Sequence, residues 1–377
     1  MLVSIQIARA IAILGVVVRH LEWIYNDINP SASPWQGSLI DIGGYGVDLF
    51  FCISGFIIGF LLSKKVWTAS DFYLRRLIRI YPFYWAFSIL FIGATLVACS
   101  VGQRGSCGPY PGFDYIISSA LLLPQGMTQP PLGVAWSLEH EVVFYALAGL
   151  ACIVFGLSVS GLLALLVVFS AVGVVNHVLL PTPIWDFHLF SLYQIEFAAG
   201  LAVFLFQDRL SRFKPLLMLA LGFIGFAVTV AIAQSLPGPI TNLGVDRAGS
   251  SGLFLVLGLA FFSACILIGL LNAERNGVFL AGGRVWKATV ATLVLIGDAS
   301  YALYLFHPTA YGVIGKAYAL LDIPNGLLLP SLLGAIVLTT LASIIWLVLA
   351  ERPLLSTAHK LLQTRSRGAR LRRTGST

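Results

Sequence analysis

The sequence predicts an all-α fold, a polytopic bundle of membrane-spanning helices. Of the 377 residues, 58% are hydrophobic and 10% are charged, whereas about a quarter of the residues in soluble globular domains carry a charge. Apolar runs of about 20 residues recur along the whole chain, and each is long enough to cross the hydrocarbon core of a bilayer. Because these runs are continuous, they do not fit the alternating strands of a membrane barrel.

Ten apolar segments qualify as spans. Their expected bounds are 5–25, 45–63, 82–102, 134–156, 158–178, 188–206, 215–235, 252–272, 290–312 and 328–350. The first segment has neither the basic leader nor the small-residue cleavage site of a signal peptide. We therefore expect it to be a retained helix. Residues 1–351 are expected to form one transmembrane domain, followed by a basic cytoplasmic tail at 352–377.

The distribution of positive charge predicts the orientation. With the N-terminus inside, 18 of the 23 Lys and Arg residues fall in inner segments, and the outer loops carry three, Arg104, Arg247 and Lys316. Because inner loops are enriched in basic residues, both termini are expected in the cytoplasm. The net charge of +7 therefore needs no nucleic-acid partner. The basic tail is expected to contact anionic headgroups, or alternatively to dock a partner.

Cysteine and histidine spacing does not predict a metal site. Three cysteines lie inside apolar runs and are expected to be small buried residues: Cys52, Cys152 and Cys265. Cys99 and Cys107 bracket a polar loop and would pair if that loop faced an oxidising compartment; otherwise they are free thiols. His177 and His188 are expected at the outer interface. The longest loop contains a nine-residue apolar segment, 115–123, which is too short to span and predicts an interfacial or re-entrant helix.

Two ionisable residues, Arg9 and His20, lie in the first span. Ionisable groups are costly in a bilayer, so they indicate function by default. Eleven residues make about three turns, so both side chains leave one helix face, roughly 16 Å apart along the axis. Histidine suits proton transfer near neutral pH. The alternatives are a hydrogen-bonded His20 near an interface and an Arg9 that reaches to the inner surface.

The second span opens with Gly46-Val47-Asp48. Asp48 is expected at a depth similar to that of His20, where a carboxylate would fix the tautomer of the imidazole and raise its basicity. Further along this span, Ser54 and Gly55 are small residues that are expected to let helices approach closely.

The inner segment before the third span carries Arg76 and Arg79. Three residues apart, the two side chains share a helix face, and guanidinium pairs bind phosphate oxygens through forked hydrogen bonds. The alternative is that they serve as topogenic charge.

Two further polar motifs lie within later spans. Trp136-Ser137-Leu138-Glu139-His140-Glu141 opens the fourth, and Glu141 aligns with Ser137 four residues earlier, so Glu141 is the favoured functional carboxylate. In the ninth, Ser300, Tyr304 and His307 follow a 0, 4, 7 spacing and form one polar stripe. Such a stripe serves either hydrogen bonding between helices or the wall of a cavity.

In this order, the five motifs resemble the integral-membrane acyltransferase family 3, and the resemblance extends to Glu351-Arg352-Pro353. The family pattern of Arg or Lys, ten residues and His is similar to Arg9 and His20, and its Arg-x-x-Arg element to Arg76 and Arg79. Its Trp-Ser-Leu-x-x-Glu element matches Trp136, Ser137, Leu138 and Glu141. Its Ser-Tyr pair and following His match Ser300, Tyr301 and His307.

The resemblance implies an O-acyltransferase that takes an acyl group from a cytoplasmic donor such as acetyl-CoA. A glycan hydroxyl of exopolysaccharide, lipopolysaccharide or a lipid-linked saccharide is the implied acceptor. Arg9, Arg76 and Arg79 are expected to bind the donor. His20 is expected to act as general base, supported by Asp48 or Glu141. Contacts with substrate are expected from Trp136, Ser137, Ser300, Tyr301, Tyr304 and His307.

Several alternatives stay open at this point. An acyl-histidine intermediate is the alternative to direct transfer, and a small molecule such as a macrolide sugar is the alternative acceptor. A transporter or flippase would also need a polar lining, although no inverted repeat with broken helices is visible in the sequence. We expect a multi-pass protein of the bacterial inner (plasma) membrane that uses no metal.

Overall fold

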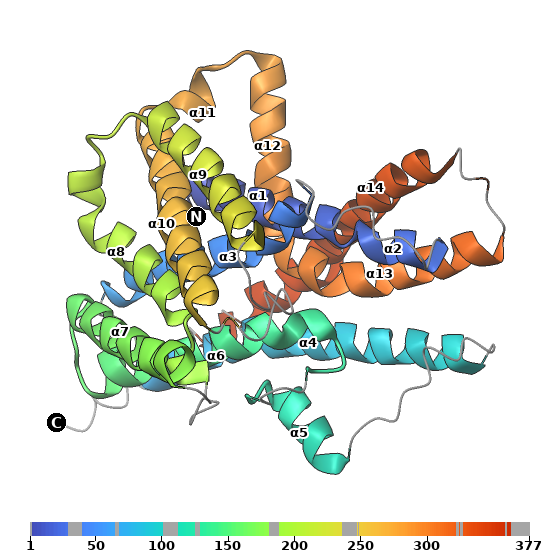
Figure 1. The fold of residues 1–377 in the computed structure, drawn as a ribbon, viewed down its shortest axis with the longest axis horizontal. Coiled ribbons are helices and arrows are strands. Elements are labelled where there is room, and N and C mark those ends of the chain that lie inside the picture. The colour runs from blue at the N-terminus through green and yellow to red at the C-terminus, as the bar shows by residue number, and fades with distance from the viewer. Residues whose placement is uncertain are drawn as a thin grey trace.

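A computed structural model of the chain describes residues 2–28, 40–64, 68–100, 112–124, 129–180, 188–235, 247, 249–321, 324, 327–358 and 360–362. Within these residues every regular element is helical (Figure 1), as predicted. The helices are α1 (Val3–Arg19), α2 (Leu21–Ile28), α3 (Gly46–Leu62), α4 (Ala69–Ser100), α5 (Phe113–Leu121), α6 (Trp136–Gly149), α7 (Val159–Val174), α8 (Gln194–Leu210), α9 (Pro215–Ser235), α10 (Gly249–Arg275), α11 (Val278–Ala281), α12 (Arg284–Asp298), α13 (Ser300–Leu320) and α14 (Leu328–Trp346).

The helical lengths confirm a multi-pass membrane protein. Among the described residues, eight helical runs are long and apolar enough to cross a membrane, and α12 with α13 would make a ninth. The predicted count of about ten included 188–206, where α8 begins at Gln194 and has 17 residues. At 1.5 Å per residue, α8 is about 26 Å long, slightly less than the hydrocarbon thickness. The orientation of the termini stays a prediction.

The predicted span 290–312 is two helices, α12 and α13, which meet at an angle of 71°. Gly297, at the end of α12, packs directly on the backbone of α1, because a Cβ there would stand 2.0 Å from the carbonyl oxygen of Gln6. The carbonyl of Gly297 accepts a hydrogen bond from Nε of Arg9 at 3.1 Å. A side chain from α1 therefore satisfies the backbone where the span breaks.

The third span is longer than predicted, because α4 begins at Ala69 and includes both Arg76 and Arg79. Its aromatic side chains also hold α5, the helix predicted near 115–123. Tyr84 and Tyr81 donate hydrogen bonds to the carbonyls of Ser119 and Leu121, at 2.8 and 2.7 Å. These bonds tie α4 to the last turn of α5, where helix carbonyls lack their usual partners four residues on.

Helices α1 and α3 lie at the centre of the molecule, between the α8–α10 group and the α13–α14 pair (Figure 1). Close packing of α3 on α8 depends on two glycines. A Cβ at Gly55 would stand 2.0 Å from the carbonyl oxygen of Phe197, and one at Gly200 would stand 1.7 Å from that of Cys52. The close approach predicted at Gly55 is therefore confirmed.

The helical run that begins at Leu328 continues past Glu351, so the domain boundary expected at 351 falls inside a helix. Residues 363–377 and Cys107 lie outside the described residues, so the membrane contact of the tail and the pairing of Cys99 with Cys107 stay predictions. Cys52 and Cys265 are buried free thiols and Cys152 is a half-buried one.

Candidate active site

A cavity of about 60 Å³ lies where α1, α3, α4, α6 and α13 meet. This volume accommodates about four water molecules. Seven of the twelve predicted site residues line the cavity: Arg9, Arg79, Ser137, Glu141, Ser300, Tyr301 and Tyr304. Its apolar wall includes Val47, Phe50, Ile53 and Leu138. All five sequence motifs thus supply polar side chains to one site, the second through Ser54, although they are spread over almost 300 residues.

Arg9 is buried and held at the break between α12 and α13. Its Nε and Nη2 donate to Oγ of Ser300 at 3.0 and 2.7 Å. The charge of Arg9 interacts electrostatically with Arg79, Glu141 and Glu351. The cation therefore stays within the membrane domain among carboxylates, which excludes the alternative that it extends to the surface.

Arg76 and Arg79, on α4, provide the second cationic element. Arg79 lines the cavity, whereas the Arg76 guanidinium lies 5.4 Å from the ring centroid of Tyr145. Within the described part of the chain, the buried Nε and Nη1 of Arg76 have no hydrogen-bond partner. Buried donors without partners are costly, so this guanidinium fits an anionic ligand such as a phosphate.

Glu141 lies in the cavity wall, where Ser54 donates to Oε1 at 2.9 Å and the hydroxyl of Tyr145 donates to the same oxygen. Neither donor is among the predicted site residues. The sequence predicts a packing role for Ser54, and the only signal for Tyr145 is its position four residues after Glu141, on the same helix face.

Two predicted tyrosines of α13, Tyr301 and Tyr304, form part of the cavity wall. The hydroxyl of Tyr304 donates to the carbonyl of Val134 at 2.7 Å and lies 2.8 Å from Oγ of Ser137. The hydroxyl of Tyr301 donates to the carbonyl of Ile80 at 2.8 Å. Trp136 does not line the cavity; its ring packs on Phe51 and Tyr193.

His20 does not line the cavity either, but pairs with His307. Nδ1 of His20 lies 2.9 Å from Nε2 of His307, and Nδ1 of His307 lies 3.1 Å from the carbonyl oxygen of Leu303. A carbonyl can only accept, so Nδ1 of His307 carries its proton and Nε2 accepts from Nδ1 of His20. This network leaves Nε2 of His20 with a free lone pair, as a general base requires.

The predicted stripe on α13 connects this pair with the cavity. Ser300 contacts Arg9, Tyr304 lines the cavity, and the Tyr304 ring lies 6.0 Å from that of His307. The two ends of the stripe therefore meet Arg9 of α1 and His20, the residue that directly follows α1.

Asp48 is not the partner of His20, which corrects the expectation. Both of its oxygens accept hydrogen bonds from the guanidinium of Arg247, which also contacts Glu196 at 3.3 Å. Burial by itself lowers the pKa of Arg247, but Asp48 outweighs this effect and raises the pKa well above its usual value. Asp48 is thus part of a buried ion-pair cluster. Sequence reasoning missed Arg247 and Glu196, because they lie 199 and 148 residues away from Asp48.

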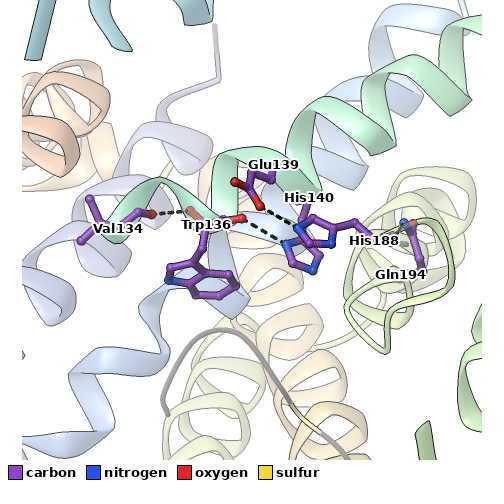
Figure 2. A network of polar contacts seen from close by, with 7 residues as sticks. Val134, Trp136, Glu139, His140, His188 and Gln194 are labelled. Atoms are coloured by element: carbon purple, nitrogen blue, oxygen red, sulfur yellow. Dashed lines mark hydrogen bonds and ion pairs between the residues drawn. The ribbon is translucent and has the colours of Figure 1, made fainter. Parts of the chain in front are cut away.

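A second buried network lies at the start of α6, where Figure 2 shows His188 between Glu139 and Gln194. Nε2 of His188 lies 2.9 Å from Oε2 of Glu139, and its ring stacks on that of His140 at 3.8 Å. His188 is buried within the protein, and its expected depth at the outer interface stays a prediction. The contacts fix the residues before α8 against α6, on a different side of α6 from Ser137.

Comparisons with known proteins identify the family. The model of an acyltransferase domain, acyltransferase family 3, matches residues 2–350. The exopolysaccharide production protein ExoZ of Rhizobium meliloti (strain 1021) is 29% identical over 345 residues, which cover 86% of this chain and 93% of that protein. A proposed O-acetyltransferase of Staphylococcus aureus (strain COL) is 24% identical over 350 residues, 84% of this chain and 52% of that protein. No solved structure matches the chain significantly. Since the family match covers nearly the whole sequence, this chain belongs to acyltransferase family 3 and is a membrane acyltransferase.

Proposed function

We propose that the enzyme transfers an acetyl group from acetyl-CoA, bound from the cytoplasmic side, to a hydroxyl of a cell-surface glycan. The similarity to a protein named for exopolysaccharide production supports the glycan acceptor, and the O-acetyltransferase relatives support the acetyl group. The excess of Lys and Arg on one side supports a bacterial plasma-membrane enzyme with both termini in the cytoplasm.

The observation that carries the mechanism is the polar stripe from Arg9 through the cavity to the His20–His307 pair. Arg76, with its open donors, and Arg79 would bind the phosphates of the donor. The cavity between them and His307 would hold the acyl end, and its volume suits a group of a few heavy atoms.

In the proposed step, the acceptor hydroxyl oxygen attacks the thioester carbonyl carbon while Nε2 of His20 takes the hydroxyl proton. The carbon–oxygen bond forms, the carbon–sulfur bond breaks, and the proton passes to the departing thiolate. His307 holds the Nδ1–H of His20 throughout, the task that a carboxylate performs in hydrolase triads. Base catalysis of this kind contributes about 10²- to 10⁴-fold in rate.

The test is His20→Asn, expressed in membranes and assayed for transfer of labelled acetyl from acetyl-CoA to the host's de-O-acetylated exopolysaccharide. A fall in kcat by about 10²-fold or more is expected, with affinity for acetyl-CoA retained. His177→Asn, a substitution of a histidine outside the site, is the matched control. Wild-type activity of His20→Asn would reject the proposed base.

A further inference from the structure

Trp23, on α2, covers the histidine pair. Its ring lies 4.1 Å from that of His20 at an interplanar angle of 18°, and 5.8 Å from that of His307 at 3°. The two imidazoles, joined edge to edge by their hydrogen bond, therefore lie under one face of the indole. Even so, Trp23 is 37% exposed, so part of this large aromatic side chain remains open.

An exposed tryptophan near the end of a span is ordinarily an interfacial anchor, whose ring faces lipid headgroups. Trp23 differs, because one face is fully engaged with the residue proposed as the base. One turn further on, Asp27 is also exposed. His20, Trp23 and Asp27 follow a 0, 3, 7 spacing, so all three lie on one side of the helical run.

We propose that Trp23 is the stacking platform for the acceptor glycan, with Asp27 as a hydrogen-bond acceptor for its hydroxyls. This inference rests on the proposed function. Pyranose rings present a face of C–H groups that packs on an aromatic ring, whose face is electron-rich. A carboxylate beside such a platform accepts hydrogen bonds from sugar hydroxyls.

The geometry also indicates which sugar binds here. A sugar ring stacked on the indole face opposite to His20 would be separated from the imidazole by the indole itself, about two stacking distances from the imidazole plane. A hydroxyl that reaches Nε2 of His20 around the indole edge must belong to the neighbouring residue of the glycan. Trp23 therefore serves oligosaccharides and contributes little to the binding of a single sugar.

The experiment measures KM for two acceptors in membranes that contain the full-length enzyme. The probes are repeating-unit oligosaccharides and the component monosaccharides of the host's de-O-acetylated exopolysaccharide. Trp23→Leu keeps apolar volume without the aromatic face, and Trp23→Phe keeps a smaller aromatic face. Trp286→Ala, at a tryptophan on α12 that is 40% exposed and does not touch the histidines, is the matched control.

Trp23→Leu is expected to raise KM for the oligosaccharide about tenfold, the loss of one stacking contact, with unchanged KM for acetyl-CoA and for the monosaccharide. Trp23→Phe should retain most of the affinity, Asp27→Ala should raise the same KM, and Trp286→Ala should have no effect. An unchanged oligosaccharide KM in Trp23→Leu, or a fall in kcat with both acceptors, overturns the platform.

If the wild type transfers acetyl to neither acceptor, the proposed function and the platform both fail. If it transfers and only the Trp23 result is negative, the platform fails alone.

Discussion

Arg9 and His20 share a helix face, yet they have different partners. Arg9 is bound to Ser300 at the break before α13, whereas His20 is bound to His307, and the two contacts belong to one stripe on that helix. The carboxylates behave differently from the expectation: Glu141 joins the cavity, and Asp48 belongs to the cluster with Arg247. At the residue scale, the role of each of these charged or polar side chains therefore follows from the residue to which it is hydrogen-bonded.

Arg76→Ala is expected to raise KM for acetyl-CoA roughly tenfold or more, because a hydrogen bond to a charged group contributes about 1.5–3 kcal/mol. Steady-state kinetics at saturating acceptor would measure this. Arg76→Lys should recover part of the affinity, since it keeps the charge without the forked donors. Arg275→Ala, at an exposed arginine that binds Gln207, is the control. An unchanged KM in Arg76→Ala would reject the phosphate role.

Asp48→Leu is expected to destabilise the protein by about 3–5 kcal/mol, because it leaves Arg247 buried without its bidentate partner. Thermal unfolding in detergent would register a lower Tm. The double variant Asp48→Leu with Arg247→Met should regain much of the loss, since well-packed apolar side chains often replace a buried ion pair. A variant of unchanged Tm that had lost kcat would instead restore Asp48 to the catalytic group.

At the scale of elements, the site depends on where helices approach and where they break. The bend of 71° before α13 directs Ser300, Tyr304 and His307 toward α1. The bend coexists with direct backbone contact between Gly297 and Gln6. A straight helix over 290–312 would not expose the Gly297 carbonyl to Arg9.

Gly297→Ala is expected to displace α12 from α1, because the added Cβ would lie 2.0 Å from a backbone oxygen and overpacking costs about 1–3 kcal/mol or more. Both Tm and kcat should fall, since Arg9 would lose its partner at the break. Gly334→Ala, where the Cβ meets no atom within 4 Å, is the matched control and should leave both unchanged. Equal behaviour of the two variants would refute the close contact.

At the scale of the whole molecule, the uneven distribution of Lys and Arg and the central cavity together predict the direction of acyl transfer. The basic residues predict which side is cytoplasmic, and on that prediction Arg76, near the start of α4, would lie on the cytoplasmic side. The His20–His307 pair lies past Tyr304 and the cavity along α13 and would lie toward the opposite side. The proposed route from donor to acceptor follows from this order.

A fusion experiment tests the direction. A fluorescent protein joined after Thr377 is expected to fluoresce, and alkaline phosphatase at the same position is expected to be inactive, because both termini are predicted in the cytoplasm. Phosphatase inserted after Arg104, in a predicted outer loop, should be active and serves as the control. The reverse pattern would invert the proposed donor and acceptor sides.

The sequence by itself determined the membrane class, most of the spans, the family and seven residues of the cavity. These features depend on apolar run length, on charge distribution and on side-chain spacing within one helix, which are all local. The tertiary structure decided which side chains from different helices meet: His307 rather than Asp48 for His20, Arg247 for Asp48, Ser54 for Glu141 and Glu139 for the buried His188. Nothing in the local sequence determines such pairs, because they depend on helix crossings set by glycine contacts and on the break before α13.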